Sequence, residues 1–158
     1  MATQLITNNL DAEFNHLYLP HLRQYVTPVV SNPLKLGSGV LVNVRGRHFV
    51  LTAAHCIESS TQVLRCQMPK PGSRVGETKP LRILHSRTHK NPEIDIGYLE
   101  IQDPECPEIQ LDQLCTDRII EGLVHVVGYP VTEVQLDLKR KEVSLLERHV
   151  FNITDRGD

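Results

Sequence analysis

From Val29 onward, apolar residues return at about every second position, which is typical of β-strands that bury one face. The pattern is clearest over residues 40–44, where valines at alternate positions are separated by a leucine and an asparagine. The pair Arg45-Gly46 interrupts it, and Arg47–Thr52 resumes it. A short polar pair that contains glycine between two such segments predicts a β-hairpin that turns at Arg45-Gly46.

Further segments predict strands because they are short, rich in apolar or β-branched residues, and bounded by turn-forming residues. They are Thr61–Gln67, Pro80–His85, Ile94–Ile101 and Leu123–Gly128. The stretch Met68–Lys79 contains prolines and glycines that predict an exposed loop, and Gln102–Glu108 reads as a connector. Charged and apolar residues alternate over residues 131–151, where no single element is predicted. Short strands separated by turns predict an all-β barrel or sandwich.

The N-terminal residues follow a different period. Over residues 8–27 apolar side chains recur at helical spacing, namely at Leu10, Phe14, Leu17 and Tyr18. Pro20 either ends this helix or opens a second turn. We therefore expect a helical lead at residues 1–28, a β domain at residues 29–107, and part of a second unit at residues 108–158.

Composition narrows the possible partners and locations. The 158 residues carry 17 lysines and arginines against 19 aspartates and glutamates, a net charge of −2. Such a chain offers no large positive field, so neither nucleic acid nor an anionic membrane is an expected partner. The chain begins without a basic, then apolar, leader, and no apolar run approaches the roughly 20 residues that span a bilayer. A cytoplasmic protein is expected.

Cysteine and histidine spacing predicts no metal site or cofactor. The cysteines are Cys56, Cys66, Cys106 and Cys115, and no two form a C-x-x-C pair. Two disulfides are possible, but without a leader, free thiols in a reducing compartment are favoured. A trio of His85, His89 and Glu93 has ligand-type side chains, but in a polar loop a solvated surface is the favoured interpretation.

The segment Leu51–Cys56 holds the candidate chemistry. His55 follows a predicted strand, and two alanines before it leave room for a substrate or another backbone. An imidazole at a strand end suits proton transfer near neutral pH. Asp95 lies between two isoleucines at the start of a predicted strand, where we expect its carboxylate to be buried and to need a partner such as a histidine N–H. Taken alone, each residue more commonly has an ordinary structural role.

The motif Thr52-Ala53-Ala54-His55-Cys56 resembles the catalytic-histidine motif of trypsin-like (chymotrypsin-fold) serine peptidases. Three further segments resemble that family in the same order, namely Gly37–Val42, Ile94–Leu99 and Val126–Pro130, the last as in bacterial members. The resemblance implies two six-stranded barrels with the active site between them. It also implies that His55 is the general base and Asp95 its orienting partner.

The sequence departs from the family in three respects. Residues 36–44 hold no cysteine, so Cys56 lacks the partner of animal relatives, as in intracellular bacterial-type members. Gly97 stands where alanine is usual. The third departure concerns the nucleophile, because no Gly-x-Ser-Gly-Gly turn occurs, and Ser144, the only serine after Asp95, has no glycine nearby. Cys106 and Cys115 also lack a glycine-rich setting.

These departures leave alternatives open. The favoured one is an N-terminal portion of a trypsin-like serine endopeptidase, with a first barrel at residues 29–107 and the start of a second at residues 108–158. Another is an inactive peptidase-like module that binds a protein or peptide. A third is an unrelated small barrel in which His55 and Asp95 lie apart. In the first two cases, a polypeptide is the expected substrate or partner, and the 158-residue chain is expected not to hydrolyse peptide bonds.

Overall fold

The computed structural model describes residues 17, 19–32, 35–66, 76–113, 121–128, 136–137, 142–143 and 147–154. About half of them form one strongly curled ten-stranded sheet, in the order β10-β11-β5-β4-β1-β2-β3-β7-β6, with β8 paired to β2. Its strands are β1 (Val26–Asn32), β2 (Lys35–Val44), β3 (Arg47–Thr52), β4 (Gln62–Cys66), β5 (Gly76–Leu81), β6 (Ile83–Thr88), β7 (Gly97–Ile101), β8 (Ile109–Gln110), β10 (Leu136–Asp137) and β11 (Glu142–Val143). All pairings are antiparallel except β2 with β8.

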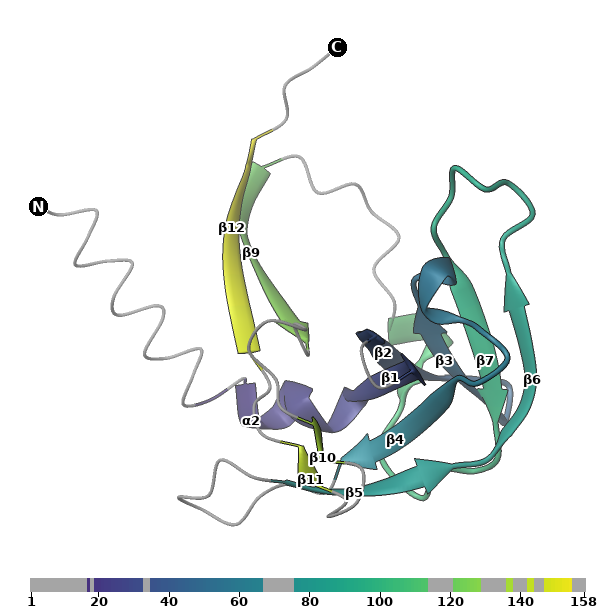
Figure 1. Cartoon of the computed structure of the whole chain (residues 1–158). Helices are drawn as coiled ribbons and strands as arrows, with labels where there is room; N and C mark the ends of the chain where they lie inside the picture. Colours follow the sequence, from purple (N-terminus) through teal and green to yellow (C-terminus); the bar gives the residue numbers. More distant parts are fainter. Residues whose placement is uncertain are drawn as a thin grey trace, which may run out of the picture.

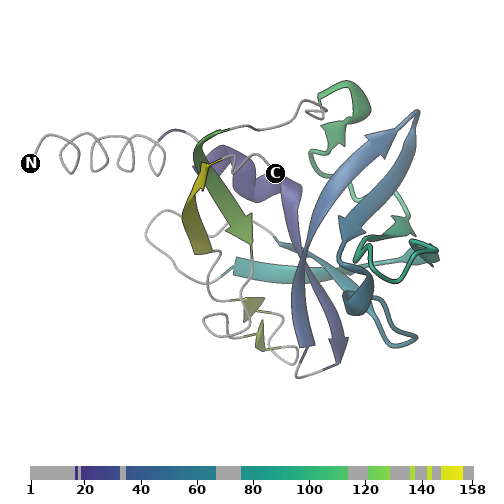
Figure 2. The same ribbon diagram turned by 90° about the horizontal axis from the view of Figure 1, so that it is seen from above.

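A separate antiparallel ribbon consists of β9 (Glu121–Gly128) and β12 (Glu147–Thr154). It stands beside the curled sheet (Figure 1), and the view from above shows it on the side where α2 (Leu19–Leu22) lies (Figure 2). One end of the ribbon meets β2, because a Cβ added at Gly128 would lie 2.7 Å from Ser38 Oγ. The predicted all-β fold is confirmed, whereas the domain division at residue 107 stays a prediction.

The β2–β3 hairpin confirms the turn predicted from alternation. Val44 pairs with Arg47, and the two residues between them have positive φ angles, 53° at Arg45 and 80° at Gly46. Two successive positive φ values favour glycine and match the right-handed twist of the flanking strands. The Asn43 side-chain oxygen accepts a hydrogen bond of 3.0 Å from the Gly46 backbone N–H, which fixes the turn further.

The core lies inside the curled sheet and follows the period of two. Along β7 every second residue is buried, with Leu99 and Ile101 each 1% exposed. They pack with Val29, Leu41, Val50 and Val63 from β1, β2, β3 and β4. This packing holds β3 beside β7 in a register that pairs Thr52 with Gly97. The chain just after Thr52 therefore lies beside the chain just before Gly97.

The N-terminal helix is not seen as predicted. Residues 19–28 of the predicted lead form the four-residue α2, the 3-10 turn η2 (Arg23–Tyr25) and the start of β1. Pro20 lies within α2, and its fixed φ is compatible with the first turn of a helix. The rest of the predicted lead falls outside the described residues. No helix in the described ranges is long and apolar enough to cross a membrane.

Two predicted strand boundaries are wrong. Pro80–His85 is divided between the end of β5 and the start of β6, with Arg82 between them. The predicted loop Met68–Lys79 accordingly ends early, because its last four residues belong to β5. The strand predicted to start at Ile94 begins only at Gly97, because residues 89–96 form a loop closed by its own backbone hydrogen bonds.

Candidate active site

His55 lies on a 3-10 turn directly after β3. The turn, η3 (Ala54–Cys56), is closed by backbone hydrogen bonds of 3.0 Å from Cys56 to Ala53 and from Ile57 to Ala54. His55 is the central residue of this turn. The preceding strand end is anchored because the Thr52 hydroxyl donates a 2.8 Å hydrogen bond to the Ser38 carbonyl. The histidine backbone is thus tied to β2.

Asp95 lies in the loop that enters β7. The loop is closed at its base by a 2.8 Å hydrogen bond from the His89 N–H to the Ile96 carbonyl. Asn91 caps it from inside, since its side-chain oxygen accepts from the Glu93 N–H at 3.0 Å. The Ile96 N–H donates back to the Ile94 carbonyl at 2.8 Å, which turns the backbone sharply around Asp95.

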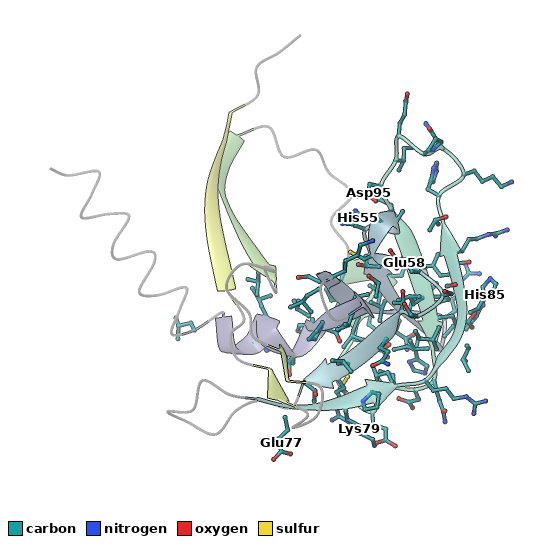
Figure 3. The ribbon with its side chains drawn as sticks, in the orientation of Figure 1. His55, Glu58, Glu77, Lys79, His85 and Asp95 are labelled. Atoms are coloured by element: carbon teal, nitrogen blue, oxygen red, sulfur yellow. The ribbon has the colours of Figure 1, made fainter. Side chains whose placement is uncertain are left out.

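The two residues meet in a two-point contact. Asp95 Oδ1 accepts a 3.0 Å hydrogen bond from the His55 backbone N–H, and Asp95 Oδ2 lies 2.5 Å from His55 Nδ1 (Figure 3). An ionised carboxylate can only accept, so Nδ1 carries the proton of this bond. In a neutral ring, Nε2 then has a lone pair available to accept a proton. The geometry excludes the unrelated barrel with His55 and Asp95 apart.

The electrostatics favour an ionised Asp95. The pKa of its carboxyl is lowered, first by the His55 backbone N–H and then by the His55 ring. The site is open, because the side chain of His55 is 72% exposed and that of Asp95 is 52% exposed. The expectation that the Asp95 carboxylate is buried between two isoleucines is therefore wrong. Ile94 and Ile96 are themselves 39% and 58% exposed, since the loop turns both away from the core.

Residues 37–157 match the model of the trypsin-like peptidase domain, which is well over half of the chain. The chain belongs to this family. No curated protein matches it. The match confirms the resemblance that rested on the histidine, aspartate and glycine segments, and it establishes a peptidase-type domain.

In this trypsin-like peptidase domain, Cys56 is a free thiol that packs against β2. A Cβ added at Gly37 would lie only 2.5 Å from Cys56 Sγ, so the facing position on β2 has room for no side chain while the sulfur stays in place. Burial raises the pKa of the Cys56 thiol, which makes it a poor nucleophile. Cys106 is also free, and burial raises its pKa too. The side chain of Cys66 and all of Cys115 lie outside the described residues.

The glycine at position 97 has a local explanation. A Cβ there would lie 2.5 Å from Ile57 Cδ1 and 3.0 Å from the Arg87 carbonyl oxygen. Gly97 thus lets β6 and the residue after η3 approach the start of β7, the strand that follows Asp95. This departure from the usual alanine leaves the contact between His55 and Asp95 intact.

Sequence reasoning missed a buried polar cluster at the other end of β3. Glu108 Oε2 lies 2.7 Å from His48 Nδ1 and accepts a 3.2 Å hydrogen bond from the Asn43 amide. The side chain of Glu108 is 7% exposed and that of His48 is 21% exposed. The cluster fastens the segment after β7 onto the β2–β3 hairpin. Glu108 lies 60 positions after His48 in the sequence, so no local motif identifies this cluster.

The other candidate residues are not assembled into a site. His85, His89 and Glu93 form no metal cluster, since the part of the chain that the structure describes holds no group of three such side chains. His89 Nδ1 instead accepts from the Asn91 backbone N–H at 3.1 Å. Ser144, the serine considered as a nucleophile, lies outside the described residues.

Proposed function

We propose that His55 and Asp95 are the general base and orienting carboxylate of a serine-type endopeptidase site that acts on polypeptides. The observation that supports this is the two-point contact, in which Asp95 binds both the backbone N–H and the ring of His55. A chance ion pair between exposed side chains needs no such double contact. Here the carboxylate holds the position of the histidine backbone and the orientation of its ring.

In this proposal, peptide hydrolysis proceeds through an acyl-enzyme. His55 Nε2 takes the proton of a serine hydroxyl as the oxygen attacks the scissile carbonyl, and it returns that proton to the leaving amine. Water then attacks the acyl-enzyme, with His55 again as the base, and the carboxylic acid product leaves as the serine hydroxyl is restored. Asp95 stays ionised throughout and stabilises the imidazolium. General-base catalysis of this kind contributes about 10²- to 10⁴-fold to the rate.

The nucleophile is proposed to lie outside these 158 residues, because they contain no Gly-x-Ser-Gly-Gly turn. We therefore expect no hydrolysis by this chain alone. The same lack favours a second function, a peptidase-like module that binds a polypeptide without cleaving it. The free thiols of Cys56 and Cys106 support a reducing, cytoplasmic location for either.

Hydrolysis of denatured casein tests the proposal. The 158-residue chain should show no activity and no labelling by a fluorophosphonate. If the gene encodes a Gly-x-Ser-Gly-Gly turn after Asp158, the longer product should cleave casein, and His55→Ala should reduce its kcat by at least about 100-fold. Cleavage by the short chain would overturn the proposed absence of a nucleophile. Full activity of His55→Ala in the longer product would overturn the role of His55, and a stop codon after Asp158 would favour the binding module.

A further inference from the structure

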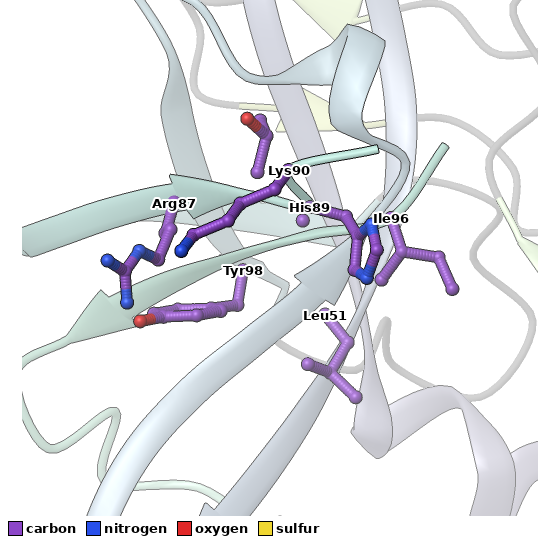
Figure 4. Close-up of a pocket in the computed structure, with 8 residues that line it drawn as sticks. Leu51, Arg87, His89, Lys90, Ile96 and Tyr98 are labelled. Carbon is purple, nitrogen blue, oxygen red and sulfur yellow. The ribbon is translucent and has the colours of Figure 1, made fainter. Parts of the chain in front are cut away.

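A hollow opens on the outer face of the sheet next to the His55–Asp95 pair. Its volume is about 370 Å³, within the range of roughly 300–1,000 Å³ that is common for ligand sites. Strands β3, β6 and β7 and the loop after β6 line it (Figure 4). The lining residues are Leu51, Arg87, Thr88, His89, Lys90, Ile96, Gly97 and Tyr98.

The hollow presents an unusual amount of apolar surface to solvent. Leu51 is 38% exposed and Ile96 is 58% exposed, although both are large aliphatic residues. Tyr98 adds an aromatic surface, and the edge-to-face contact of its ring with Phe49, at 5.5 Å between centroids, holds it in place. Exposed aliphatic and aromatic side chains gathered in a concave site are typical of a binding surface.

Positive charge borders this apolar surface. Arg87 and Lys90 line the hollow, and no lining residue is acidic. Within the described ranges neither cation forms an ion pair. Two nearby carboxylates are engaged elsewhere, since Asp95 binds His55 and Glu100 binds Arg47 in a bidentate pair of 2.8 and 3.0 Å. The hollow therefore favours an apolar group that carries negative charge beside it.

We propose that this hollow binds an acidic polypeptide segment, with one large apolar side chain in the hollow and flanking carboxylates against Arg87 and Lys90. The binding goes beyond the proposed peptidase chemistry, because it requires neither His55 nor a nucleophile. Its position links it to that chemistry, since Leu51 is on the strand that leads to His55 and Ile96 directly follows Asp95. A bound segment would lie beside the pair and hold the attached polypeptide near it.

Fluorescence anisotropy with the peptide fluoresceinyl-Glu-Asp-Leu-Phe-Asp-Glu-amide, which carries the label at its N-terminus, tests the proposal on the 158-residue chain. Arg87→Glu with Lys90→Glu should weaken binding about tenfold or more, because two attractive contacts become repulsive. The matched control is Arg45→Glu with Arg82→Glu, which changes net charge equally at exposed arginines outside the hollow and should leave Kd within about twofold.

A second pair of variants tests the apolar part. Ile96→Ser should weaken binding about fivefold or more, whereas Leu84→Ser, at an equally exposed leucine on β6, should not. Circular dichroism establishes that each variant is folded. The proposal fails if the peptide does not bind, or if both double charge-reversal variants weaken peptide binding equally. It fails too if a peptide in which lysines replace the acidic residues binds equally tightly. It also fails if sedimentation shows a dimer that Ile96→Ser dissociates, because the occupant would then be a second copy of the chain.

Discussion

Substitution of Gly37 tests whether Cys56 packs against this position on β2. Cys56 directly follows His55, the proposed base, in the chain. An alanine Cβ at position 37 would lie 2.5 Å from Cys56 Sγ, about 1 Å inside the optimal separation of roughly 3.5–4.0 Å. Overpacking of this kind costs about 1–3 kcal/mol. In a strand, alanine in place of glycine otherwise gains about 0.5–1 kcal/mol. Gly37→Ala alone should therefore destabilise the fold by up to about 2.5 kcal/mol.

The sign of this effect should reverse when the sulfur is removed. In Cys56→Ala, the atom nearest to the new Cβ is the Cys56 Cβ position at 3.5 Å, which is an ordinary contact. Gly37→Ala should then stabilise the fold by about 0.5–1 kcal/mol, so the coupling in the double-mutant cycle is about 1–3 kcal/mol. Urea unfolding of the four proteins measures it. Gly37→Ala with Cys106→Ala is the control, and its coupling should be near zero. An equal effect of Gly37→Ala in both Cys56 backgrounds would refute the packing described here.

Three further predictions follow from the same contacts. Gly37→Cys should form a disulfide with Cys56 under mild oxidation, since their Cβ atoms would lie 3.5 Å apart; mass spectrometry should show the loss of two hydrogens, absent in Gly37→Cys with Cys56→Ala. Glu108→Ala should destabilise the fold by about 2–4 kcal/mol in urea because it leaves His48 and Asn43 without their buried partner, whereas Glu105→Ala, at a 76% exposed side chain, should change stability by less than about 0.5 kcal/mol. The folded-state pKa of Asp95 is lowered, so its contribution to stability is present above the unfolded value near 3.9 and is lost as pH falls through the folded pKa. Asp95→Asn should therefore flatten the acid-side loss of stability below about pH 4 and abolish the far-downfield proton resonance of His55 Nδ1–H; an unchanged acid transition would contradict the pairing.

Local chemistry explains why some of the fold could be predicted from sequence. The β2–β3 hairpin follows from alternation and from the positive φ at Gly46, both of which are properties of neighbouring residues. The His55–Asp95 pair came from recognised motifs in the family order, and the two residues are in contact in the structure, while their catalytic roles stay a prediction. Burial of Asp95 was predicted wrongly because flanking isoleucines were assumed to face the core, whereas the loop backbone turns them outward.

The features that sequence did not predict depend on contacts between distant segments. Glu108 reaches His48 only because the connector after β7 folds back over the hairpin. The hollow is assembled from β3, β6 and β7, and each of its residues is ordinary within its own strand. The boundary between β5 and β6 arises because β5 pairs with β4 whereas β6 pairs with β7. No local pattern at Arg82 predicts this change of partner.

The register between β3 and β7 determines where His55, the proposed base, lies relative to Asp95. Thr52 pairs with Gly97, so the residues just beyond each strand end, which carry His55 and Asp95, face each other at one edge of the sheet. A slip of two residues would preserve which side chains face the core but would displace the strands by about 7 Å, which breaks both hydrogen bonds from His55 to Asp95. Leu99 and Ile101, each 1% exposed, oppose such a slip because it would move core side chains out of their packing sites. The orientation of His55 is therefore determined by the packing of this sheet and does not depend on the presence of a nucleophile.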